Sequence, residues 1–166
     1  MRIPPTSATS GIPVEVEPRL LDAALPGADW ADAYEMITQR RFADMREVAH
    51  ATVGSMPPWS RLLLKVRNVV VRPFGLKPDG MADAPDSAAR VDIFPILDER
   101  VDSIVLGLDD VHLNFRIVIE RTPLTAGDQI RITTLVQRHN LFGRMYIAAI
   151  TPFHKAIARA SIQQAV

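Results

Sequence analysis

The sequence contains no cysteine among its 166 residues, and this absence removes several kinds of chemistry at once. Disulfide bonds, thiolate nucleophiles and cysteine-based zinc sites all need a thiol. An excess of charge of one sign is also absent, because 19 Lys and Arg residues balance 19 Asp and Glu residues. Proteins that grip nucleic acid through its phosphates carry a visible basic excess, so no nucleic acid partner is expected.

Long apolar runs are missing as well. Residues 1–17 are interrupted by prolines and hydroxyl side chains, which is not the pattern of a signal peptide. The most apolar stretch, residues 62–71, is broken by Lys65, Arg67 and Asn68, and it is too short to cross a hydrocarbon core of about 30 Å. The sequence therefore predicts a soluble, cytoplasmic protein without a membrane span.

The overall composition is that of an ordinary globular protein, with 48% hydrophobic and 23% charged residues. A chain of this length can bury most of its apolar surface around one core. Residues 1–18 are rich in proline and show no hydrophobic period, which disfavours both helix and sheet. We therefore expect a flexible, poorly ordered arm over residues 1–18 and a single domain over residues 19–166.

The first half of the domain predicts one strand and two helices. Residues 30–37 (WADAYEMI) fit a strand slightly better than a short helix, because they include aromatic and β-branched side chains. Apolar residues at helical spacing predict a short helix over residues 42–53, ended by Gly54. A second helix is predicted over residues 57–71, and the segment 77–90, without any apolar period, is predicted as a long mobile loop.

The hydrophobic period changes from 3.6 to two near residue 90. Residues 111–121 carry apolar side chains at the odd positions, and residues 130–136 repeat this alternation after a turn at 123–128. Shorter strands are predicted over residues 91–96 and 103–108. Consecutive strands with short connections predict an antiparallel meander.

The C-terminal segment returns to helical spacing, with apolar side chains recurring over residues 146–157. Pro152 lies inside this pattern and removes one helical hydrogen bond. Two alternatives follow: a long helix kinked at Pro152, or a strand over residues 144–150 followed by a helix that Thr151 caps. The kinked long helix is the preferred interpretation.

Three segments of the chain carry a resemblance to a known family: MPPWSRLLLKVRNVVVRPFGLK, VLGLDDVHLNFRIVIE and LVQRHNLFGRMYIAAITPFHKAI. They resemble a bacterial family known as domain of unknown function 2867, over about residues 28–160. The resemblance implies an α+β, helix-grip (START-like, SRPBCC-type) fold, in which an antiparallel sheet wraps around a long C-terminal helix and leaves a cavity between them. It implies no reaction and no catalytic residue. Relatives occur attached to an NAD(P)-binding domain, whereas this chain has no GxGxxG stretch.

The implied cavity leads to two hypotheses about function. The first is a binding module that takes a small, mainly apolar molecule, with Thr134 as the polar side chain most expected to face inward. The second is an enzyme in which His154 or Tyr146 exchanges a proton with an enolisable, polyketide-like substrate. No cofactor is expected. The expected lining consists of Leu113, Phe115, Ile117, Ile132, Thr134, Val136, Tyr146, Ile150, Phe153 and His154.

A third hypothesis concerns the opposite face of the strand that begins at residue 111. His112, Asn114 and Arg116 share that face at a period of two, and they either face water or meet a partner. An accessory domain that docks there on an NAD(P)-dependent oxidoreductase is one expectation, and a homodimer is another. His112, His139 and His154 show no metal-ligand spacing, so no metal site is expected.

Overall fold

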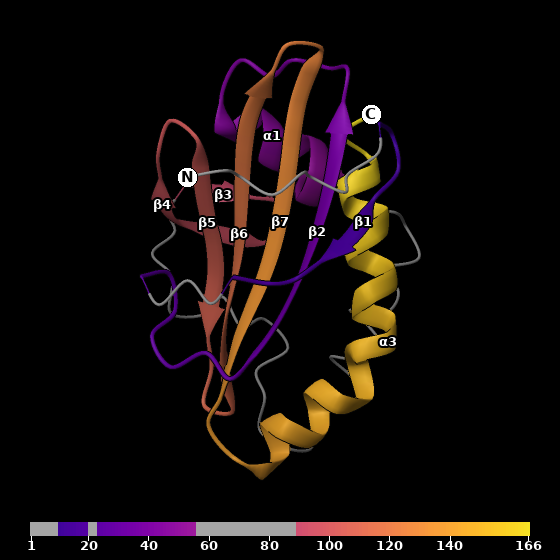
Figure 1. Cartoon of the computed structure of the whole chain (residues 1–166). Helices are drawn as coiled ribbons and strands as arrows, with labels where there is room; N and C mark the ends of the chain where they lie inside the picture. The colour runs from indigo at the N-terminus through magenta and orange to yellow at the C-terminus, as the bar shows by residue number, and fades with distance from the viewer. Residues whose placement is uncertain (1–9, 20–22, 56–88) are drawn as a thin grey trace, which may run out of the picture.

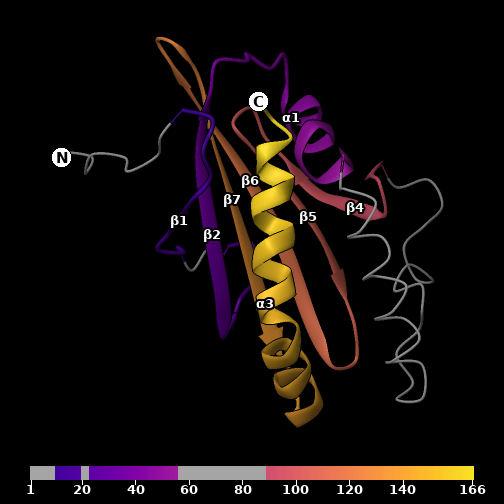
Figure 2. The ribbon, with the colours of Figure 1, turned by 90° about the vertical axis from the view of Figure 1, so that its right-hand side faces the viewer.

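The computed structural model describes residues 10–19, 23–55 and 89–166. In these ranges the chain forms a seven-stranded sheet with α3 (Leu141–Gln163) and the short α1 (Met45–Thr52) on the same side of it (Figures 1 and 2). We call the face toward α3 the inner face and the opposite one the outer face. The predicted α+β class, with an antiparallel sheet and a C-terminal helix, is confirmed.

The sheet has the strand order β1-β2-β7-β6-β5-β4-β3, and every neighbouring pair is antiparallel. The first long strand therefore lies beside the last one, which closes the predicted meander against the N-terminal half of the chain. The strands are β1 (Val14–Val16), β2 (Trp30–Thr38), β3 (Arg90–Val91), β4 (Phe94–Glu99), β5 (Ser103–Asp109), β6 (Leu113–Leu124) and β7 (Gly127–Arg138).

The hairpin between β6 and β7 depends on a glycine. Gly127 has φ +140°, and a Cβ atom at this position would collide with the carbonyl oxygen of Thr38. Only glycine adopts this conformation and leaves that space free. The tight turn lets β6 and β7 pair over their whole length, from Leu113 opposite Arg138 to Leu124 opposite Gly127.

The predicted strand over residues 91–96 is wrong in one respect, because the structure divides it into β3 and β4. These two strands form a tight hairpin in which Val91 lies opposite Phe94. The turn residue Asp92 has φ 53°, a left-handed conformation that aspartate adopts more readily than most residues. Both Val91 and Phe94 are buried, so their hydrophobic pattern is that of a continuous strand and does not reveal the turn.

The predicted arm is corrected for residues 14–16, which form β1 and pair with β2, with Val16 opposite Ala33. Prolines lie on both sides of this short strand, and because proline disfavours strands, the sequence did not predict it. Glu15 strengthens its attachment, because its carboxylate pairs with Lys155 at 2.6 Å and with Arg159 at 3.0 Å on α3. The rest of the prediction for residues 1–9 lies outside the described residues.

The predicted helix over residues 42–53 is confirmed as α1. Asp44 caps it, since its side chain accepts a hydrogen bond of 2.8 Å from the backbone N–H of Glu47. A 3-10 turn, Val53–Ser55, follows. The predicted second helix over residues 57–71, and nearly all of the predicted loop over residues 77–90, lie outside the described residues.

The long C-terminal helix is confirmed, and the alternative strand over residues 144–150 is wrong. Asn140 caps α3 by accepting a hydrogen bond of 3.0 Å from the backbone N–H of Gly143. Pro152 lies inside the helix and is exposed, so water can bond the carbonyl that its ring leaves unpaired. Figure 1 shows the axis of α3 changing direction along its length.

The main core lies between the inner face, α1 and the C-terminal end of α3. It consists of large apolar side chains that are almost completely shielded from water, and each contributes about 1.5 to 3 kcal/mol by its burial. Its most deeply buried members are Tyr34, Met36, Met45, Val48, Ile104, Leu106, Ile119, Ile130 and Ile162.

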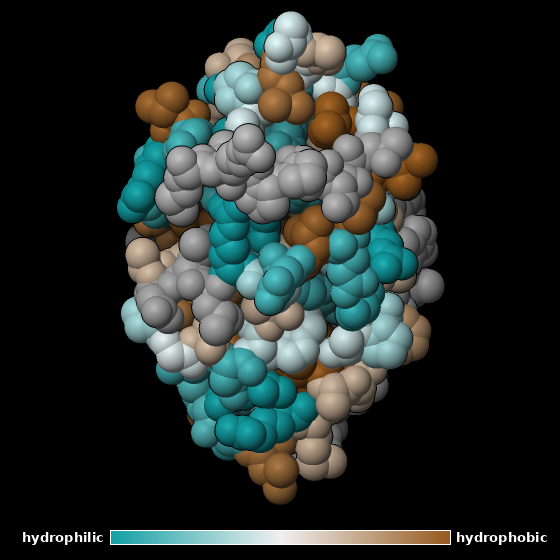
Figure 3. Space-filling view, viewed as in Figure 1, coloured by the Kyte–Doolittle hydropathy of each residue, from teal (hydrophilic) through white to brown (hydrophobic). Residues whose placement is uncertain are grey.

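The outer face is partly covered by residues 17–19 and 23–29, which lie between β1 and β2 in the chain. Figure 1 shows this connection crossing in front of the central strands, and Figure 3, in the same view, shows mainly hydrophilic residues around it. Leu25 anchors the connection, because it is buried against Val118 of β6 and Leu135 of β7. The sheet is therefore partly buried on both faces.

Candidate functional site

Strand β2 places an acidic side chain on the inner face of the sheet. Alternate residues of a strand point to the same side, so Asp32 shares this face with Trp30 and Tyr34. Asp32 is only 4% exposed. A buried carboxylate costs free energy unless a partner compensates the loss of water, so its surroundings decide what it can do.

The partner of Asp32 is His154 of α3. Nε2 of His154 lies 3.1 Å from Oδ1 of Asp32, and the two side chains are 25% and 5% exposed. The imidazole also meets the Trp30 ring edge-on, with 5.5 Å between the ring centres. Because Nε2 faces a carboxylate, the neutral imidazole carries its proton on Nε2 and keeps a lone pair on Nδ1.

Two oxygen atoms beside this pair are buried and have no hydrogen-bond partner within the described part of the chain. They are Oδ2 of Asp32 and the hydroxyl of Tyr34. Burial raises the pKa of Tyr34 to about 12, with a further contribution from the negative charges of Asp32 and Glu15. The phenol is therefore neutral at pH 7 and retains a proton that it can donate.

Five of the ten expected lining residues lie together between α3 and the sheet. Leu113 and Val136 are buried in one cluster, and Phe115, Tyr146 and Ile150 are partly buried in the same cluster. Ile147 and Trp30 complete this group, which we call the apolar cluster. Several of its large side chains remain partly exposed although they face the inside of the fold.

The other expected lining residues on the strands also point to the inner face. Ile132 is buried in the main core, and Ile117 is partly buried against it. Thr134 is 7% exposed and lies directly opposite Asp32 in the ladder between β2 and β7. The prediction that Thr134 faces inward therefore agrees with its position.

The expectation that Phe153 lines the cavity is wrong, because its side chain is 56% exposed. The buried residues of α3 are Gly143, Ile147, Ala158, Ser161 and Ile162. Several of these are small, and they contribute little to a hydrophobic pattern. The larger residues at the same spacing, Tyr146 and Ile150, do pack in the apolar cluster, so the predicted face of α3 is right there and fails at Phe153.

The predicted partner surface is largely engaged within the chain. Arg116 is paired with Asp109 at 2.6 Å, and its side chain is only 13% exposed. Asn114 bonds Gln137 at 3.3 Å, and the side chains of His112 and Asn140 meet at 2.9 Å. These contacts give the docking hypothesis no support.

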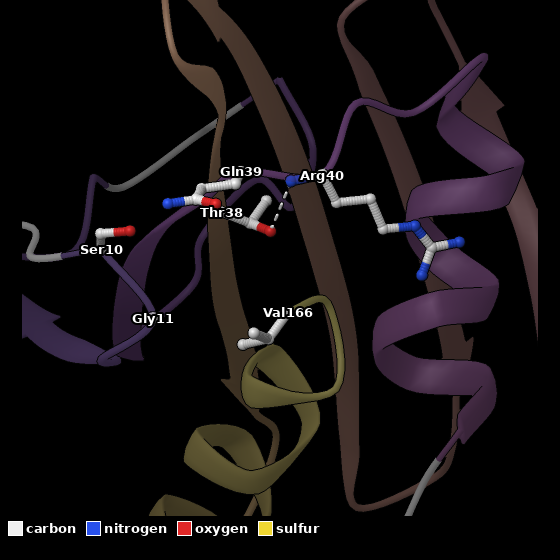
Figure 4. A pocket seen from close by; sticks show the side chains of 6 residues that line it. All are labelled: Ser10, Gly11, Thr38, Gln39, Arg40 and Val166. Carbon is white, nitrogen blue, oxygen red and sulfur yellow. Dashed lines mark hydrogen bonds between the residues drawn. The ribbon is translucent and has the colours of Figure 1, made fainter.

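A pocket of about 390 Å³ lies elsewhere, near the C-terminal end of α3 (Figure 4). Its lining includes Ser10, Gly11, Thr38, Gln39, Arg40 and Val166. The Thr38 hydroxyl donates to the carbonyl of Ala165 at 2.9 Å and accepts from the backbone N–H of Arg40 at 3.1 Å. In Figure 4 the Arg40 side chain points away from the pocket toward α1, where it pairs with Glu47.

The described ranges contain neither a metal-ligand cluster nor a helix that could span a membrane. No group of three or more His, Asp or Glu side chains gathers there as ligands for a metal ion. In the same ranges, no helix combines the length and the apolar character that crossing a bilayer requires.

Comparison with known proteins agrees with the resemblance. Residues 24–161 match a family described as proteins of unknown function (DUF2867). The chain belongs to this family. Neither a curated protein nor a solved structure matches it. The family description assigns no activity, so the function has to be argued from the site itself.

Sequence reasoning found His154 but missed Asp32, Trp30 and Tyr34. A signal was present, because the strand over residues 30–37 alternates Trp30, Asp32, Tyr34 and Met36 on one face. A carboxylate in an otherwise apolar row of side chains is uncommon, and such buried charged groups are enriched at functional sites.

Proposed function

We propose that this protein is a START-like binding module of the cytoplasm, which holds a small, mainly apolar molecule between α3 and the inner face of the sheet. The observation that carries the proposal is the position of the His154–Asp32 pair beside the apolar cluster. The long helix against an antiparallel sheet, with β2 adjacent to β7, supports the helix-grip class.

The apolar cluster supplies the main binding surface. Phe115, Tyr146 and Ile150 are partly exposed side chains that an apolar ligand would remove from water. Each square ångström of apolar surface so buried contributes about 25 cal/mol. Apolar walls with a few convergent polar groups are typical of small-molecule sites.

The test replaces Thr134 by Trp and uses N-phenyl-1-naphthylamine, an uncharged dye that fluoresces in apolar surroundings. If vacant volume lies beside Thr134, the larger side chain occupies it, and dye binding is lost while the melting temperature is kept. The control is Thr122→Trp, at an exposed position of β6.

A close-packed interior would behave differently. Thr134→Trp would then overpack the site and reduce the free energy of unfolding by about 1 to 3 kcal/mol. That destabilisation, together with no dye binding by the parent protein, would reject the proposal.

A second candidate function is proton exchange with an enolisable substrate, and the pairing of His154 with Asp32 favours it. The Cα–H bond of a ketone would break, the proton would pass to Nδ1, and the electron pair would move to the carbonyl oxygen as an enolate. Deuterium uptake by 2-tetralone, followed by NMR, should be accelerated by the protein and lost in His154→Gln. No acceleration would exclude this activity for that ketone class.

A further inference from the structure

We propose that the ligand of this site carries a hydroxyl group, which donates a hydrogen bond to Nδ1 of His154. This inference rests on the proposed binding function and specifies the chemical class of the ligand: an uncharged, mainly apolar alcohol or phenol. Asp32 acts through His154 as a positioning residue and does not touch the ligand.

The two ring nitrogens of His154 have different surroundings. Nε2 is taken up by Asp32, whereas Nδ1 has no hydrogen-bond partner within the described residues. Nδ1 is also absent from the polar atoms that are both buried and unpaired. With a quarter of the His154 side chain exposed, Nδ1 is an accessible hydrogen-bond acceptor.

The carboxylate of Asp32 determines the character of that acceptor. It is 95% buried, so its negative charge is poorly screened and polarises the imidazole. A carboxylate that accepts a hydrogen bond from one nitrogen of a neutral imidazole fixes the tautomer, as it does for metal-binding histidines, and the other nitrogen then presents its lone pair. Oδ2 of Asp32 is shielded from solvent, so a ligand would reach the pair through His154.

Matching of donors and acceptors then selects the ligand. A ketone, an ether or a carboxylate offers no proton to Nδ1, and a carboxylate is also repelled by Asp32. A hydroxyl group supplies the missing donor. The surroundings of His154 are apolar, since Trp30 meets the imidazole edge-on and Ile150 stands one helical turn before it.

The experiment compares two probes of similar shape, 1-naphthol and 1-methoxynaphthalene, by isothermal titration calorimetry. Only the first can donate a hydrogen bond. We expect the intact protein to bind 1-naphthol about 10-fold more tightly, which corresponds to about 1.4 kcal/mol. Equal affinity for the two probes would overturn this proposal and leave the binding function standing. If neither probe binds, the binding function for such ligands fails as well.

Variants then assign the preference to the residues. His154→Phe and His154→Gln should each bring the two affinities to within about 3-fold, while 1-methoxynaphthalene binds as before. Asp32→Asn keeps the size of the side chain but removes the charge, and it should reduce the preference. The matched control is His139→Phe, an exposed histidine before α3, which should keep the full preference.

The ratio of the two affinities separates recognition from folding. A variant that is only less stable binds both probes less tightly by the same factor, so the ratio of the two affinities does not change. A full preference in both His154 variants would overturn the assignment of Nδ1. A full preference in Asp32→Asn would overturn the positioning role of Asp32.

Discussion

Two buried carboxylates stand three residues apart on β2, and the sheet separates them. Glu35 faces outward, where Arg131 lies at 2.8 Å and the Gln129 amide at 3.0 Å, so each carboxylate oxygen has a partner. Asp32 faces inward, where it meets one histidine, and within the described residues its Oδ2 has no partner. Strand β2 therefore carries two different carboxylates. Both oxygens of Glu35 are hydrogen-bonded, whereas Oδ2 of Asp32 has no hydrogen-bond partner among the described residues.

The difference separates a pair with a structural role from the pair to which we assign a role in the proposed function. Arg131 also donates to the carbonyl of Glu17 at 2.6 Å, so the outer pair attaches the chain after β1 to the sheet. In the described part of the chain, Nε of Arg131 and Oε2 of Glu120 have no hydrogen-bond partner, but they face each other at 3.8 Å with opposite charge. The inner pair joins α3 to β2 with one hydrogen bond, and it lies beside partly exposed apolar side chains.

The largest expected effect is on the outer face. Arg131→Leu leaves Glu35 buried without its cation, and the free energy of unfolding should fall by about 3 to 5 kcal/mol in urea titrations. The double variant Glu35→Leu with Arg131→Leu should recover most of this loss, because no isolated charge remains. If Arg131→Leu lowers the free energy of unfolding by less than about 1 kcal/mol, the Glu35–Arg131 pair does not have the structural role that distinguishes it from the Asp32–His154 pair.

The next effect concerns Tyr34 on the inner face and appears at alkaline pH. Its pKa in the folded protein is about 12, against an ordinary value of 10.0, so the unfolded chain ionises first. Stability is therefore fully present below about pH 10 and declines as the pH rises toward 12, by about 1 to 2 kcal/mol.

Tyr34→Phe should remove this alkaline decline. At pH 7 the substitution should change the free energy of unfolding little, because within the described residues the Tyr34 hydroxyl makes no hydrogen bond of ordinary geometry and has only a weak interaction with the nearby Arg159 guanidinium. The check is the difference in unfolding free energy between parent and variant at pH 7, 9 and 11. A difference that does not change with pH would show that Tyr34 ionises equally easily in both states.

The smallest effect is expected for Asp32→Asn. The amide oxygen can still accept from Nε2 of His154, and removal of a buried charge offsets part of any loss, so stability should change by about 1 kcal/mol or less. Thermal unfolding at pH 7 measures this. A loss of unfolding free energy as large as that of Arg131→Leu would show that the Asp32–His154 pair is also structural. It would contradict the difference between the two carboxylates.

Much of the fold follows from local pattern. The alternation over residues 111–121 and 130–136 predicts β6 and β7, because side chains of a strand alternate between two faces. The spacing after Gly143 likewise predicts α3. Local pattern failed where its signal is weak: β1 is short and lies between prolines, and the turn at Asp92 lies between two buried apolar residues.

The candidate site was predicted in part. Its apolar members follow from the sidedness of strands, and His154 was among them. Phe153 was misplaced, since small residues define the packed face of α3 and a hydrophobic pattern gives them little weight. The partner of His154 was not found, because no local rule connects two residues that are 122 positions apart.

The sequence by itself thus determined the types of most described elements, the order of the meander and the inward faces of β6 and β7, since these depend on the period of a few neighbouring side chains. Only the tertiary structure decided that α3 crosses β2 at the height of Asp32. That contact depends on the pairing of β2 with β7 and on the rotation of α3 about its axis. Both are set by packing between distant segments, where burial of the whole core, and not local propensity, dominates the free energy.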